Sequence, residues 1–170
     1  MKYYKDCSKE QSFFKEEEDM AVRLSVLGLR VVKERSGNYD FEDKKISSPS
    51  KARDILEEVF ELSELAEEVC IIMCLDTKNK VTGLFKVSQG SLNSCIVHPR
   101  EVFKRALMQN ASSIILAHNH PSGDTTPSSE DISTAKRLDE AGNLLGVAVL
   151  DHIIVGANGN YRSFKEGGLL

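Results

Sequence analysis

The sequence predicts an α/β (α+β) protein with a mixed central β-sheet flanked by helices. Short continuous apolar runs, typical of buried strands, alternate along the chain with longer amphipathic segments, typical of helices. Clusters of turn-forming residues separate these segments. Hydrophobic residues make up 41% and charged residues 28% of the 170 residues, which indicates a folded globular chain rather than a disordered or collagen-like one.

The apolar runs predict the strands. The clearest is the continuous run over 69–75, which a turn over 76–79 connects to a return strand over 81–87. The expected strands, in chain order, are 21–34, 69–75, 81–87, 95–97, 113–117 and 147–155.

Capping residues and apolar stripes predict three helices. The first begins at a Ser-Pro pair (48–49), where a cap residue precedes proline at the first helical position, and its outer face is acidic. The second opens at a His-Pro pair (98–99). The third spans 128–141 and is expected to stop at Gly142 or Asn143.

Composition indicates how the chain is divided and in which cellular compartment we expect it. We expect an N-terminal extension over 1–47, with the strand at 21–34 and a turn-rich linker, followed by a folded domain over 48–170. The net charge of −4 argues mildly against a protein that coats nucleic-acid phosphates. No apolar run approaches the roughly 18 residues of a membrane helix, and the first lysines precede no apolar stretch. We therefore expect a cytoplasmic protein with no membrane segment.

Four cysteines occur, at 7, 70, 74 and 95. In a reducing compartment they are expected to stay reduced. Cys70 and Cys74 are spaced CxxxC within an apolar run, which favours buried small hydrophobic residues. A zinc or redox role would need a second cysteine pair, and the sequence has none.

The segment over 118–131, HNHPSGDTTPSSED, carries the chemistry. His118 and His120 are two residues apart, so both imidazoles point to one side of an extended backbone. Ser128 has the position of a helix cap, and Asp131 follows at the capping-box spacing. Two neutral imidazoles and one carboxylate suit a three-ligand zinc site whose fourth position is left for water.

Simpler interpretations of these residues exist. A surface His-x-His pair is weak evidence alone, and capping alone explains the Ser128-Asp131 spacing. Their joint position at the carboxyl end of a buried strand favours a metal site, because ligands of α/β sheets gather there. The Asp151-His152 pair in the last strand either orients a ligand imidazole or is a structural pair with satisfied hydrogen bonds.

The string HxHP, six residues and SxxD resembles the JAMM metal motif of the JAB/MPN metalloprotease superfamily, and the fuller context resembles its RadC-like branch. The matching context includes LDTKNKV, HPREVFKRAL, ASSIILAHNHPSGD and LDHIIVG. The resemblance implies a JAB/MPN (cytidine-deaminase-like) fold and one Zn²⁺ per chain. It implies His118, His120 and Asp131 as metal ligands, and Ser128 as the residue that helps hold the reacting water or oxyanion.

The resemblance also implies a glutamate that acts as general acid and base. RadC-like chains have an acidic residue just before the strand that leads to the LDTKN-type turn, and Glu68 matches this position. Glu67 is the neighbouring alternative, although it also continues the acidic outer face of the first helix. The third alternative is that neither residue has this role.

Three functions compete at this stage. The first is a JAMM-type zinc metallopeptidase or isopeptidase with an unknown peptide or protein substrate. The second is a DNA-repair-associated protein that binds DNA or a repair partner. We expect a short family member without the helix-hairpin-helix segment of longer RadC-like chains, which weakens direct DNA binding. The third is a metal-binding interaction domain without turnover. The H-x-E and P-C-x-x-C pattern of nucleobase deaminases is absent from the sequence.

Overall fold

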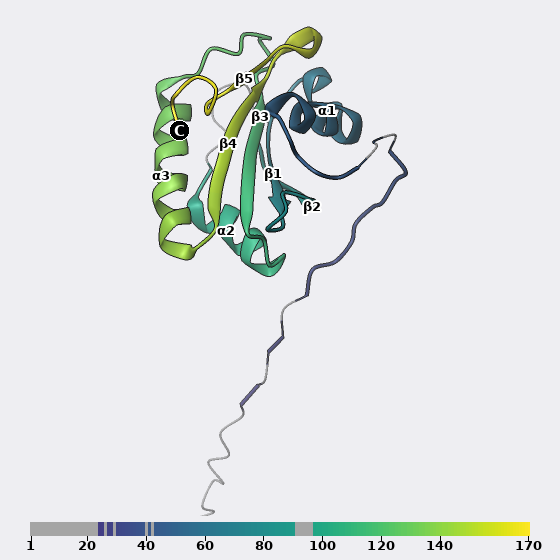
Figure 1. Ribbon diagram of the computed structural model, residues 1–170, viewed down its shortest axis with the longest axis vertical. Coiled ribbons are helices and arrows are strands. Elements are labelled where there is room, and N and C mark those ends of the chain that lie inside the picture. Colours follow the sequence, from purple (N-terminus) through teal and green to yellow (C-terminus); the bar gives the residue numbers. More distant parts are fainter. Residues whose placement is uncertain (1–23, 26, 29, 40, 42, 91–96) are drawn as a thin grey trace, which may run out of the picture.

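A computed structural model describes residues 24–25, 27–28, 30–39, 41, 43–90 and 97–170. A five-stranded mixed sheet lies between helix α1 on one face and helices α2 and α3 on the other (Figure 1). This arrangement confirms the predicted fold class. The strands are β1 (Glu68–Leu75), β2 (Val81–Gly90), β3 (Ser113–Asn119), β4 (Ala148–Val155) and β5 (Tyr161–Ser163). The helices are α1 (Pro49–Phe60), α2 (Pro99–Met108) and α3 (Ser129–Leu145), with 3₁₀ turns η1 (Leu62–Glu64) and η2 (Ala157–Gly159).

The strand order is β2-β1-β3-β4-β5. Strand β1 pairs antiparallel with both β2 and β3, whereas β3 and β4 are parallel and are connected through α3. The central strands are buried on both faces, which explains why their sequences are continuous apolar runs instead of alternating ones.

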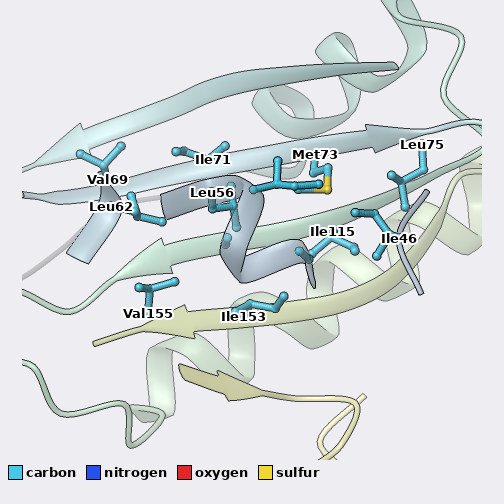
Figure 2. Close-up of a cluster of buried hydrophobic side chains, with 13 residues drawn as sticks. Ile46, Leu56, Leu62, Val69, Ile71, Met73, Leu75, Ile115, Ile153 and Val155 are labelled. Atoms are coloured by element: carbon cyan, nitrogen blue, oxygen red, sulfur yellow. The ribbon is translucent and has the colours of Figure 1, made fainter. Parts of the chain in front are cut away.

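Alternate residues of the central strands build two cores. Ile71 and Met73 of β1 pack with Leu56 of α1 (Figure 2), whereas Ile72 of β1 packs with Phe103 of α2 on the opposite face. Each fully buried side chain of this size contributes roughly 1.5–3 kcal/mol. The two cores fix which face of β1 and β3 each side chain occupies, and therefore which side chains point toward α3.

Helix α3 is longer than the sequence predicted, and its predicted stop at Gly142 or Asn143 is wrong. The helix ends at Gly146, which has a left-handed φ of 71° and donates its N–H to the Gly142 carbonyl. Gly142 has a packing role, because a Cβ at this position would lie 2.4 Å from the carbonyl oxygen of Val147. The glycine lets the helix lie close to the chain that leads into β4.

The predicted strand over 21–34 is not found among the residues described there, 24–25, 27–28 and 30–34. Leu24 and Leu27 are 86% and 88% exposed. Periodicity alone misled the prediction, since a strand also needs a hydrogen-bonding partner. Strand β5 was missed because three residues give no periodic signal. The predicted strand over 95–97 lies mostly outside the described residues.

Two other sequence-based expectations concern burial and the membrane. Cys70 and Cys74 are both buried in the core, and burial raises the pKa of the Cys74 thiol to about 12. The other two cysteines lie outside the described residues. Among the described residues, no helix is long and apolar enough to cross a membrane.

Candidate metal centre

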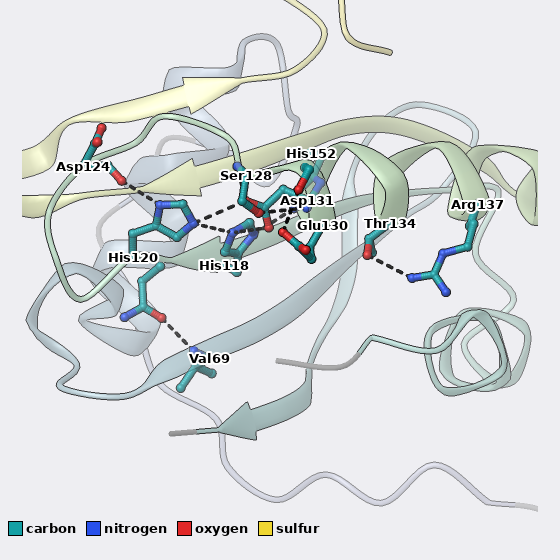
Figure 3. Close-up of polar contacts among 12 residues, drawn as sticks. Val69, His118, His120, Asp124, Ser128, Glu130, Asp131, Thr134, Arg137 and His152 are labelled. Atoms are coloured by element: carbon teal, nitrogen blue, oxygen red, sulfur yellow. Dashed lines mark hydrogen bonds and ion pairs between the residues drawn. The ribbon is translucent and has the colours of Figure 1, made fainter. Parts of the chain in front are cut away.

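The two histidines stand at the carboxyl end of β3, where the strand passes into a loop (Figure 3). Ladder pairing places His118 opposite Cys70 on β1 and beside Ile154 on β4. Because side chains alternate along a strand, His118 and His120 reach the face that α3 covers. Their Nε2 atoms lie 3.0 Å apart.

Asp131 enters this site from the first turn of α3, where a capping box holds it. Ser128 Oγ accepts the N–H of Asp131 at 3.1 Å, and the Asp131 carboxylate accepts the N–H of Ser128 at 2.8 Å. The Asp131 oxygens lie 3.2 Å from His118 Nε2 and 3.5 Å from His120 Nε2. The structure therefore brings together the three side chains that the sequence selected as ligands.

The hydrogen bonds of His120 fit a metal ligand. Its Nδ1 lies 2.6 Å from the carbonyl oxygen of Asp124, which can only accept, so Nδ1 carries the hydrogen. In the neutral ring, Nε2 then presents its lone pair to His118 and Asp131. A ligand histidine that donates its second nitrogen to a backbone carbonyl is the usual arrangement in metal sites.

His152 contacts the Nδ1 atom of the His118 ring. His118 Nδ1 lies 2.8 Å from His152 Nε2, and both rings are buried. When His118 Nδ1 is the donor in this bond, His118 Nε2 is free to bind a cation. Asp151 does not share this task. It accepts bonds from the His152 N–H, Ser163 Oγ and the Lys165 N–H.

The charges of the centre depend on these contacts. In the metal-free chain, burial opposes ionisation of Asp131, but hydrogen bonds donated by the Nε2 atoms of His118 and His120 outweigh it and hold the pKa of Asp131 well below its usual range. The hydrogen bond with Asp131 raises the pKa of His120 above its ordinary 6.5. Burial, reinforced by the neighbouring His118 ring, lowers the pKa of His152.

A cleft of about 1160 Å³ opens at this centre. Its lining includes the apolar side chains Val97 and Leu116, together with Thr134 and Arg137 on α3. Arg137 donates to the Thr134 hydroxyl at 3.1 Å. The cleft is large enough for several residues of an extended chain or for a small organic molecule.

Glu68, the first residue of β1, and Glu67, which precedes the strand, have different surroundings. Glu68 lines the cleft, and its charge contributes to the raised pKa of His120. Cys70, two residues along the strand, shares its face and lies opposite His118. Glu67 is exposed and accepts a hydrogen bond from Gln89 instead. Of the two neighbouring glutamates, Glu68 is therefore the one that lines the cleft at the candidate metal centre.

Sequence reasoning missed two contributors to the site. Asn119, between the two histidines, is 1% exposed and bonds to the chain on both sides of Glu68. The Asp124 carbonyl, which orients His120, left no signal because any residue supplies a carbonyl. The signal for Asn119 was a polar residue at the end of a buried apolar strand.

The family model described as RadC-like JAB domain matches residues 46–169. The chain belongs to the RadC-like JAB domain family. The JAB domain is of a hydrolase-type superfamily and can bind zinc, in agreement with the donor set formed by His118, His120 and Asp131.

The RadC-like JAB domain of this chain is similar to curated proteins named UPF0758. It is 49% identical over 128 residues to the UPF0758 protein of Clostridium beijerinckii, covering 75% of this chain and 55% of the relative. It is 49% identical over 151 residues to that of Caldanaerobacter subterraneus subsp. tengcongensis, covering 87% and 62%. The chain thus spans a little over half the length of these relatives.

We predict that Gly156→Ala weakens divalent-cation binding. A Cβ at Gly156 would lie 2.4 Å from the Gly123 carbonyl oxygen and 2.7 Å from Thr125 Cγ2, so the loop that carries His120 must shift. We expect at least a tenfold loss of Co²⁺ affinity, measured by absorption titration. Gly146→Ala is the control, because its left-handed φ strains the other end of α3. Equal affinities for the two variants would contradict the prediction.

The metal-free chain offers a test by pH. The Asp131 carboxylate favours protonated His120, so an NMR titration should place the pKa of His120 above 6.5. Asp131→Asn removes the negative charge and should lower this pKa. The buried His152 ring should stay neutral over the same range. A His120 that titrates below 6.5 in the unaltered chain would refute this account of the electrostatics.

Proposed function

We propose that the protein is a zinc-dependent hydrolase of the JAMM type, a metallopeptidase or isopeptidase that directs a metal-activated water against an amide bond. One observation carries the proposal. His118 Nε2, His120 Nε2 and the Asp131 carboxylate converge within 3.0–3.5 Å of one another, in a cleft that Glu68 also lines. Three protein ligands of this type are what catalytic zinc sites use.

His118, His120 and Asp131 would hold the zinc ion, with His152 and the Asp124 carbonyl orienting the two rings. When bound, zinc supplies a more acidic water and a Lewis acid for a carbonyl oxygen. A metal ion binds a carboxylate in its ionised form, and the Asp131 oxygens lie 3.2 and 3.5 Å from the Nε2 atoms of His118 and His120.

Glu68 would move the proton in this reaction. Its carboxylate takes a proton from the attacking water as the new C–O bond forms at the substrate carbonyl. The same group then gives that proton to the leaving nitrogen as the C–N bond breaks, so the products are an acid and an amine. Its place on the cleft side of β1 supports this role over Glu67.

Ser128 has a defined task in the structure. Its hydroxyl donates to Asp131 at 2.7 Å and accepts the Asp131 N–H, so it fixes the carboxylate in the first turn of α3. Donation to a developing oxyanion, which the family resemblance implies, would require the hydroxyl hydrogen to turn away from Asp131. That second role stays a prediction.

The charges around the cleft disfavour the binding of DNA within it. The acidic residues Glu68, Glu130 and Asp131 line it. Among the lining residues that the structure describes, Arg137 is the only arginine or lysine. A nucleic-acid backbone needs clustered cations to replace its counterions. The choice of an amide bond rests on the family, since metal-activated hydrolysis itself would suit other substrates.

Zinc content tests the ligand assignment. The purified protein should hold about one zinc per chain by elemental analysis, and the double variant His118→Ala/His120→Ala should lose it, because a single carboxylate remains. His98→Ala is the matched control, since His98 is the N-cap residue of α2 and does not line the cleft. Zinc retained at full occupancy by the double variant would reject the assignment.

Turnover tests the role of Glu68. We expect Glu68→Gln to keep zinc and to lower cleavage at least 100-fold in a screen of peptide and isopeptide libraries, because the amide cannot shuttle the proton. Glu67→Gln, whose side chain bonds to Gln89, should cleave within threefold of the unaltered chain. Unchanged cleavage by Glu68→Gln would assign the proton transfer to another group.

A further inference from the structure

Asn119 stands between the two histidines in sequence and faces the other way. It is 1% exposed, and its side chain reaches the segment that leads into β1. Its Oδ1 accepts the N–H of Val69 at 2.8 Å. Its Nδ2 donates to the carbonyl oxygens of Glu67 at 3.0 Å and Leu65 at 3.2 Å.

These three bonds pair both N–H donors and the oxygen of the Asn119 amide. A carboxamide has two N–H donors and one oxygen acceptor, and each finds a backbone partner here. A buried asparagine with every group paired is a specific structural device, because burying it unpaired would cost roughly 1–3 kcal/mol per group.

The bonded groups bracket one residue. The Glu67 carbonyl precedes Glu68 and the Val69 N–H follows it, so Asn119 holds the backbone on both sides of Glu68. The backbone pairing of β1 with β3 ends at Cys70 and His118. The Asn119 side chain therefore connects the two strands beyond their last backbone pair. Without it, the start of β1 would be hydrogen-bonded only to β2.

We propose that Asn119 is a positioning residue that fixes the backbone around Glu68 and so holds the Glu68 carboxylate in the cleft beside the metal ligands. The inference rests on the proposed function, in which Glu68 moves the proton. The pleat of β3 provides the coupling: His118 and His120 face the metal while the intervening residue anchors the acid/base. Residues 118–120 thereby position both the histidine ligands and the Glu68 carboxylate.

Two substitutions separate positioning from metal binding. Asn119→Ala removes all three bonds, whereas Asn119→Asp keeps the acceptor for Val69 but sets a carboxylate oxygen against two carbonyl oxygens. For both variants we expect zinc affinity within threefold of the unaltered chain and a kcat lowered 10- to 100-fold at nearly constant KM.

A readout independent of turnover accompanies the kinetics. Amide hydrogen exchange, followed by NMR, should be at least tenfold faster at Val69 in Asn119→Ala, while the amide of Ile71 stays within threefold. Ile153→Ala is the matched control, because it removes a buried side chain of the same core without touching the hydrogen bonds to Val69. This variant should lower the unfolding temperature. Its kcat and its ratio of the Val69 to the Ile71 exchange rate should stay within threefold of those of the unaltered chain.

A double-mutant cycle decides whether Asn119 acts through Glu68. In a Glu68→Gln background, Asn119→Ala should lower kcat by no more than threefold further. An equal loss in both backgrounds, loss of zinc from Asn119→Ala, or unchanged exchange at Val69 would overturn the inference. If the unaltered chain binds zinc but cleaves nothing, the proposed function fails, and so does the inference that Asn119 supports catalysis. Faster Val69 exchange in Asn119→Ala would then still show that Asn119 fixes the backbone around Glu68.

Discussion

The pleat of β3 is the constraint on which the candidate centre depends. Successive side chains of a strand point to opposite faces, so two histidines separated by one residue share the α3 face. Burial of β3 by the cores on both faces prevents a one-residue slip, which would send both imidazoles into the core around α1. The packing of apolar residues far from the cleft thus determines where the donor nitrogens lie.

The second half of the centre depends on how α3 begins. The capping box of Ser128 and Asp131 satisfies N–H groups of the first turn, as in many helices, but here the capping carboxylate also meets His118 and His120. The same carboxylate therefore caps the helix and belongs to the candidate metal centre. The loop between β3 and α3 is fixed by close approach of Gly156, so the distance between imidazoles and carboxylate is set by backbone packing.

Much of this arrangement could be predicted from the sequence, because it follows from local patterns. The helix start after Ser48, the buried run over 69–75 and the spacing of His118, His120 and Asp131 all have short-range signals. The failures have physical causes. The alternation over 21–34 does not supply a partner strand, and Gly142 packs inside α3 against the chain near β4, while Gly146 caps the helix. The contact of His152 with His118 and the bonds of Asn119 arise only when strands pair.

The candidate metal ligands and Glu68 also differ in how the chain brings them together. The three candidate ligand side chains lie within residues 118–131, so their approach closes only a short loop, whereas Glu68 joins them by pairing β1 with β3 across 50 residues. Short-range closure loses less entropy and is faster than long-range strand pairing. Bringing Glu68 to the candidate ligands therefore costs more chain entropy than bringing those ligands to one another, and it depends on the pairing of β1 with β3.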